Sequence, residues 1–176
     1  MVGIESLLIL LPVIVYYAGK LINQFVKEEL IGKEKLLQRL VYLAPIIPLI
    51  LGVTLIQFTI NQAILAGLMS IVPLIVSKNK LEKYRYSINN ILLGLMIGAN
   101  LDNYLVILGI SAYFYFTSNL DYYSKDKSLV KRRLLEQGVF LAFGLASNFL
   151  AITELSFAAS AAMTVLYVKE SLIKKR

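Results

Sequence analysis

The chain has 176 residues, of which 58% are hydrophobic and only 16% charged, and its mean hydropathy is +0.71. Soluble domains carry about 25% charged residues, and so short a chain has too small an interior for this apolar excess. Histidine and cysteine are absent, which excludes disulfides, thiol chemistry, histidine catalysis and the usual zinc sites. The composition predicts a membrane protein, and the net charge of +7 is assigned to cytoplasmic loops rather than to nucleic-acid binding.

The first apolar run extends from Ile4 to Val26. It lacks a basic leader and a small-residue cleavage site, so it predicts a membrane helix rather than a cleaved signal peptide. A charged segment, 27–39, follows, and the next apolar run covers 40–77. Because one span needs about 20 residues, this second run predicts a helical hairpin with its turn at 58–62.

Two further long apolar runs follow, each bounded by charged segments. The run 86–119 is interrupted by the sequence GANLDN at 98–103, and the run 134–168 by AITE at 151–154. Asn and Asp favour turns because their side chains bond nearby backbone groups. Both runs are therefore predicted to be hairpins.

The predicted fold is an all-α, polytopic transmembrane bundle of about seven spans, made of one helix and three tight hairpins in a single domain, 1–176. Six spans would result if one short segment only dips into the membrane. Helices are preferred to a barrel because the apolar runs are continuous, whereas barrel strands alternate. The predicted spans are 4–26, 40–58, 61–77, 86–101, 103–119, 134–151 and 154–169.

The basic residues fall on one side of this arrangement. All Lys and Arg residues except Lys20, which lies one turn inside the first helix on the same side, occur in the charged segments 27–39, 77–85 and 121–133 and in the C-terminal tail. None lies in an opposite turn. Positive loops are cytoplasmic. We therefore expect the N-terminus outside, the C-terminus in the cytoplasm, and a location in the cell membrane of a prokaryote.

Small and polar residues at helical spacing are the candidate packing or pathway residues. They comprise a GxxxG pair in the fourth span, a polar residue deep in the sixth and a hydroxyl stripe in the seventh, each able to join helices or to line a polar pathway. Lys20 could reach the cytoplasmic interface or pair with Glu136. The candidates are Gly94, Gly98, Asn148, Ser156, Ser160 and Thr164.

Asp102 and Glu154 fall in the predicted outer turns. They would form either an acidic outer mouth, a carboxylate pair for a metal ion, or ordinary solvated turn charges. Two carboxylates without histidine are a weak metal signature, so we predict no metal site. No motif indicates catalytic or cofactor-binding residues, and no cofactor is expected.

The sequence favours a non-catalytic, membrane-embedded subunit of a larger transport or energy-converting complex. Its expected partners are the lipid bilayer and other membrane subunits, or further copies of itself. The small size, the short loops and the lack of an ionisable residue near the centre of any predicted span support this reading, since coupled pumps normally need such a residue. The alternatives are a stand-alone permease or channel for a small solute, and a membrane enzyme acting on a lipid phosphate.

Overall fold

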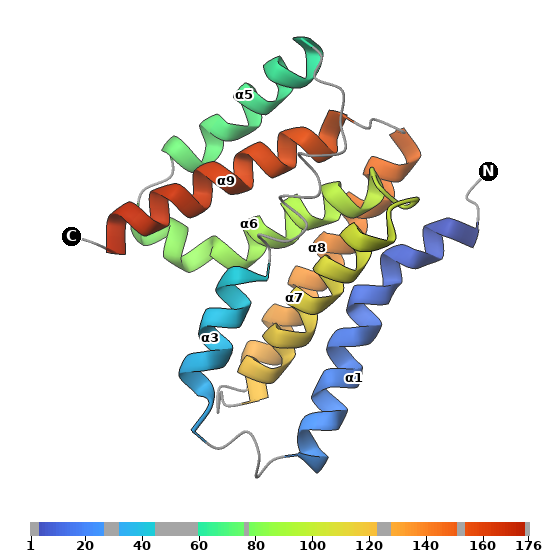
Figure 1. Cartoon of the computed structure of the whole chain (residues 1–176), viewed down its shortest axis with the longest axis vertical. Helices are drawn as coiled ribbons and strands as arrows, with labels where there is room; N and C mark the ends of the chain where they lie inside the picture. The colour runs from blue at the N-terminus through green and yellow to red at the C-terminus, as the bar shows by residue number, and fades with distance from the viewer. Residues whose placement is uncertain are drawn as a thin grey trace.

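A computed structural model describes residues 4–26, 32–44, 60–75, 78–122, 128–150 and 154–174. Within these ranges the chain is all-α and contains no strand (Figure 1), which confirms that the fold is all-α. A 3-10 helix leads directly into the first α-helix. The elements are η1 (Ile4–Leu10), α1 (Leu11–Phe25), α3 (Glu34–Leu43), α5 (Ile60–Ile75), α6 (Lys78–Gly98), α7 (Tyr104–Tyr122), α8 (Ser128–Leu150) and α9 (Glu154–Lys174).

Several helices extend beyond the apolar runs into the charged segments. α6 begins at Lys78, α8 begins at Ser128, and α3 includes the charged stretch from Glu34 to Arg39. Lys, Arg and Glu are good helix formers, so a helix need not end where hydropathy falls. The remainder of the predicted span 40–58, with Pro45 and Pro48, lies outside the described residues.

The structure places a short turn between α6 and α7. The Asn103 Oδ1 atom accepts hydrogen bonds from the backbone N–H groups of Leu105, at 3.1 Å, and Val106, at 3.4 Å, and so caps α7. Asn100 Nδ2 donates to Ser156 Oγ in α9 at 2.5 Å. The turn therefore starts one helix and is anchored to another.

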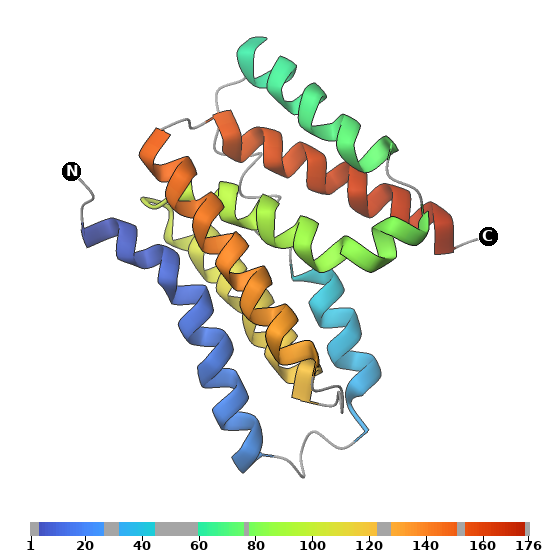
Figure 2. The same ribbon diagram turned by 180° about the vertical axis from the view of Figure 1, so that it is seen from behind.

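The helices alternate in direction. In Figures 1 and 2, α1, α5, α7 and α9 run one way, and α3, α6 and α8 run the other way. α6 lies at the centre and packs against α7, α8 and α9, while α1 and α3 pack on α7 and α5 packs on α9. The apolar side chains at the centre, among them Leu93, Met96 and Phe140, are fully buried.

Glycines bring α6 and α8 into backbone contact. A Cβ atom added to Gly94 would lie 2.5 Å from the carbonyl oxygen of Phe140, and one added to Gly98 would overlap the carbonyl oxygen of Gly144. Ser147 Oγ adds a hydrogen bond to the Leu95 carbonyl oxygen at 3.0 Å. We call this contact, made by Gly94, Leu95, Gly98, Phe140, Gly144 and Ser147, the glycine seam.

Within the described residues, one helix is both long and apolar enough to cross a membrane. It covers Ser6–Phe25, near the N-terminus, where a signal sequence would have the same properties, and Ser87–Gly98 forms a shorter apolar helix. The structure thus gives one candidate membrane helix in this part of the chain.

Candidate functional site

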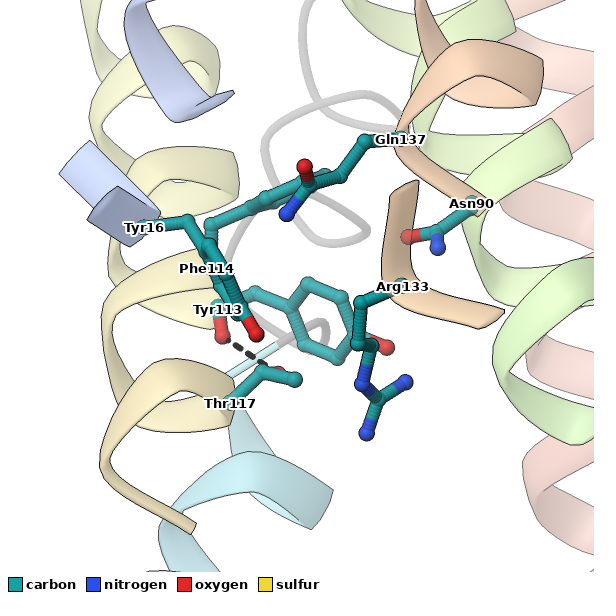
Figure 3. Close-up of a pocket in the computed structure, with 7 residues that line it drawn as sticks. All are labelled: Tyr16, Asn90, Tyr113, Phe114, Thr117, Arg133 and Gln137. Carbon is teal, nitrogen blue, oxygen red and sulfur yellow. Dashed lines mark hydrogen bonds between the residues drawn. The ribbon is translucent and has the colours of Figure 1, made fainter. Parts of the chain in front are cut away.

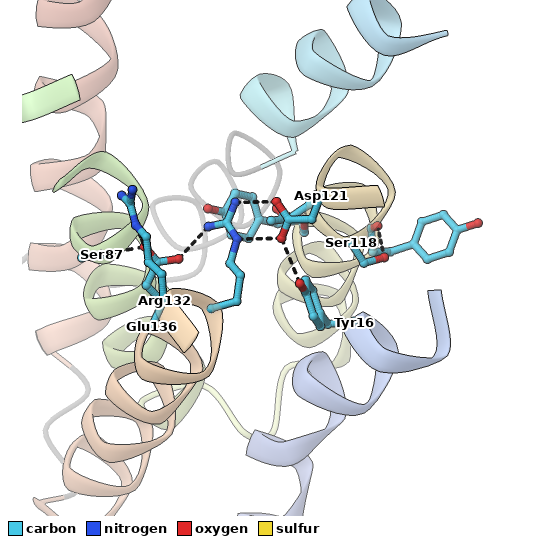
Figure 4. Close-up of polar contacts among 10 residues, drawn as sticks. Tyr16, Ser87, Ser118, Asp121, Arg132 and Glu136 are labelled. Carbon is cyan, nitrogen blue, oxygen red and sulfur yellow. Dashed lines mark hydrogen bonds and ion pairs between the residues drawn. The ribbon is translucent and has the colours of Figure 1, made fainter. Parts of the chain in front are cut away.

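Ionised and hydrogen-bonding side chains meet where α1, α6, α7 and α8 come together. Figure 4 shows the arrangement, in which Asp121 from α7 lies near Tyr16 from α1, and Glu136 from α8 lies near Ser87 from α6. We call this group the charge cluster. Its members are Tyr16, Ser87, Asp121, Arg132, Arg133 and Glu136.

Arg133 is the centre of the charge cluster. Its Nε and Nη2 atoms donate to the two carboxylate oxygens of Asp121 at 2.6 and 2.7 Å, and its Nη1 atom donates to Glu136 Oε2 at 2.6 Å. The Arg133 and Asp121 side chains are each 8% exposed. This two-pronged geometry is the strongest arrangement that an arginine makes with a carboxylate.

The two carboxylates have further partners. Tyr16 OH donates to Asp121 Oδ2 at 2.8 Å, and Arg132 Nε donates to Glu136 Oε1 at 2.9 Å. Ser87 Oγ lies 3.5 Å from the same Glu136 oxygen. Two arginines thus face two carboxylates, and the charge cluster has no net charge, as buried ions require.

The sequence contains the parts of the charge cluster but not their pairing. Arg132, Arg133 and Glu136 are three and four positions apart on α8 and so share a helix face. From the sequence, Asp121 and Arg133 are expected at the two ends of one charged loop. In the structure, Asp121 lies in the last turn of α7 and Arg133 lies near the start of α8. Glu136 bonds to the arginines of its own helix, so the suggested pairing with Lys20 is not the one observed.

A small cavity adjoins the charge cluster (Figure 3). Its volume is about 10 Å³, and Tyr16 and Arg133 belong both to its wall and to the charge cluster. Asn90 and Gln137 are 5% and 4% exposed. The Asn90 Oδ1, Gln137 Oε1 and Gln137 Nε2 atoms are buried without a hydrogen-bond partner among the described residues. We call this the polar cavity; it is lined by Tyr16, Asn90, Tyr113, Phe114, Thr117, Arg133 and Gln137.

The residues selected from the sequence lie elsewhere. Gly94 and Gly98 are in the glycine seam, and Asn148 Nδ2 donates to Ser6 Oγ in η1 at 2.9 Å. In α9, Ser160 Oγ donates to the Ser156 carbonyl oxygen at 2.8 Å, and Thr164 Oγ1 to the Ser160 carbonyl oxygen at 2.9 Å. None of these residues lines the polar cavity.

The two outer acids occupy different elements. Asp102 is exposed in the turn between α6 and α7, and Glu154 is half-buried in the first turn of α9. The bond from Asn100 to Ser156 joins these two regions. The described part of the chain holds no group of three or more His, Cys, Asp or Glu residues suited to a metal ion.

No protein-family model, no curated protein and no solved structure matches this chain. The features that bear on its function are therefore the charge cluster, the polar cavity and the surface of the bundle.

Proposed function

We propose that this chain is a multi-pass membrane protein that serves as a non-catalytic subunit of a larger transport or energy-converting complex. The observation that supports this proposal most strongly is that large apolar side chains are exposed while charged side chains are buried. Phe25, Leu135 and Phe149 are 87%, 72% and 82% exposed, whereas Arg133 and Glu136 are 6% and 3% exposed. In soluble proteins, large apolar residues such as Leu and Phe are most often buried, and charged residues are mostly exposed. Lipid accepts an apolar surface and favours polar groups that are satisfied inside the bundle.

The directions of the helices support the seven-span topology proposed from the sequence. In Figure 1, α1, α5, α7 and α9 each run downward and to the left; α5 and α9 end at the left of the view, near the chain's C-terminus, and α1 and α7 end lower down. Basic segments follow each of these helices in the sequence. Positive charge would thus collect at one membrane face, the cytoplasmic one.

One face of α8 supports association with another membrane helix. Gly138, Ala142 and Ala146 recur at every fourth position and are all exposed, and nothing lies within 4 Å of a Cβ added to Gly138. Small residues let helices approach closely in lipid, where no hydrophobic force joins them. This face is the docking surface that we propose for the partner subunit.

The topology can be tested with single cysteines, because the chain has none of its own. Asn61→Cys and Asp102→Cys should react with a membrane-impermeant maleimide on intact cells. Ser128→Cys and Ser171→Cys should react only after permeabilisation. Labelling of Ser128→Cys on intact cells would overturn the proposed topology.

The subunit role can be tested by mild detergent extraction and measurement of the particle mass. We expect a heteromeric particle that Gly138→Leu dissociates, because the new side chain blocks the proposed docking face. Gly67→Leu is the matched control, since Gly67 is also a helical glycine with open space around it. A monomer unaffected by either change would contradict the subunit role.

A stand-alone permease for a small neutral solute is the second candidate. The polar cavity favours it, because buried amides without partners inside a bundle could take a solute's hydrogen bonds. Passage of such a solute by the purified monomer in liposomes would establish this function and exclude the first.

A further inference from the structure

The polar cavity leaves hydrogen-bonding capacity unused. Gln137 has both amide atoms buried without a partner among the described residues, and Asn90 has its oxygen in the same state. An unsatisfied buried polar group costs free energy, so native proteins rarely leave one without a partner, a water or a ligand. Two such side chains lining one cavity point to an occupant.

The shape of the polar cavity limits the size of that occupant. A volume of about 10 Å³ is roughly the room that one water-sized group needs. Figure 3 shows the Asn90 side chain on α6 and the Gln137 side chain on the neighbouring helix α8, both extending from the right of the view toward the side where Tyr113 and Phe114 lie. The occupant therefore meets amides from α6 and α8 together.

The electrostatics of the neighbouring charge cluster limit the occupant's charge. Among the described residues that line the cavity, the only ionised side chain is Arg133, and its guanidinium is already bonded to Asp121 and Glu136. A charged occupant would find no unneutralised opposite charge to offset its burial. The unused atoms are two acceptors and one donor group, which suit a molecule that both donates and accepts.

We propose that the polar cavity is a binding site for one small neutral molecule of the size of water that both donates and accepts hydrogen bonds. Gln137 and Asn90 hold it, and Tyr16 and Arg133, held in turn by Asp121, form the wall on the side of the charge cluster. This site does not depend on the proposed subunit role, since it requires only the packing of α1, α6, α7 and α8.

A crystal structure of the full chain, grown in a lipid phase without small solutes, tests the site. Density is expected within hydrogen-bonding distance of both the Asn90 and Gln137 side chains. Absence of density, with the two amides bonded to each other or to other side chains, would overturn the proposal.

Thermal unfolding with added formamide tests the size of the occupant. No saturable rise in the unfolding temperature is expected, because the polar cavity has room for only one water-sized group. A saturable rise that Gln137→Leu removes would overturn this size limit and identify a small amide as the ligand. Sodium formate, of similar size but charged, should give no saturable rise. A saturable formate effect that Gln137→Leu removes would contradict the requirement for a neutral occupant.

Two variants on α8 provide the matched comparison. Gln137→Leu should abolish both the density and any formamide effect, and Gln137→Met serves if the leucine variant does not fold. Asn148→Leu removes an amide from the same helix, but one that bonds Ser6 outside the polar cavity. It should leave the density unchanged, and loss of the density in this variant would count against a local site.

Discussion

The glycine seam and the charge cluster join α6 to α8 at two levels by opposite means. In the glycine seam, side chains are absent, and backbone from Gly98 meets backbone from Gly144. In the charge cluster, long side chains span the space, and Arg133 and Glu136 connect α8 to α7 and α6. Asn90 and Gln137 stand between the two levels in sequence and line the polar cavity. Close backbone packing leaves no room for an occupant, whereas contacts through long side chains can enclose one.

Removing the central arginine should have the largest effect. Arg133→Leu leaves the carboxylates of Asp121 and Glu136 buried without their main partner, which costs about 3–5 kcal/mol in comparable cases. The measurement is reversible unfolding in mixed micelles. Arg132→Leu is the control, because the Arg132 side chain is 45% exposed, and the loss should be at most about 1 kcal/mol. Equal losses of unfolding free energy in the two variants would show that the burial of Arg133 does not determine how much it stabilises the protein.

A single methyl group should disturb the glycine seam. Gly98→Ala places a Cβ atom against the Gly144 carbonyl oxygen, and backbone cannot yield as a side chain can, so we expect a loss of about 1–3 kcal/mol in unfolding free energy. Gly138→Ala is the matched control on α8, where the Cβ meets open space. It should be neutral or slightly stabilising, because Ala favours helix over Gly. A neutral Gly98→Ala would refute the backbone contact.

The hydrogen bond within the glycine seam should matter less. Ser147→Ala removes the bond from Ser147 Oγ to the Leu95 carbonyl oxygen, while leaving that carbonyl its place in the α6 helix. Interhelical bonds in membrane bundles average about 0.6 kcal/mol. The same unfolding assay should show a loss of unfolding free energy near this value. A loss as large as that of Gly98→Ala would mean that the hydrogen bond, and not the close backbone approach, contributes most to the stability of the glycine seam.

The smallest effect is expected in α9. Ser160 Oγ bonds a carbonyl oxygen of its own helix, so Ser160→Ala breaks no hydrogen bond between the described helices and should change the unfolding free energy by less than about 0.5 kcal/mol. A change that matches or exceeds that of Ser147→Ala would mean that Ser160 also bonds across an interface.

The candidate site could be predicted only in part. The spacing of Gly94 and Gly98 identified a face for packing or a pathway, and the structure places that face against α8. Asp121 and Arg133 were visible as charges but were assigned to a loop, because hydropathy falls before the helices end. Gln137 and Asn90 carry no sequence signal beyond their polarity, so the polar cavity could not be anticipated.

The sequence by itself determined that this chain is helical, because long apolar runs with turn residues between them can satisfy their backbone hydrogen bonds only locally. It also determined that nearly all basic residues lie in the charged segments between the apolar runs and in the C-terminal tail. Only the tertiary structure decided which polar groups meet. Asn148 bonds Ser6, 142 positions away, and Asp121 bonds Arg133, 12 positions away, while Gln137 is left without a partner among the described residues. Helical periodicity assigns a residue to a face, but the packing of helices chooses what that face touches.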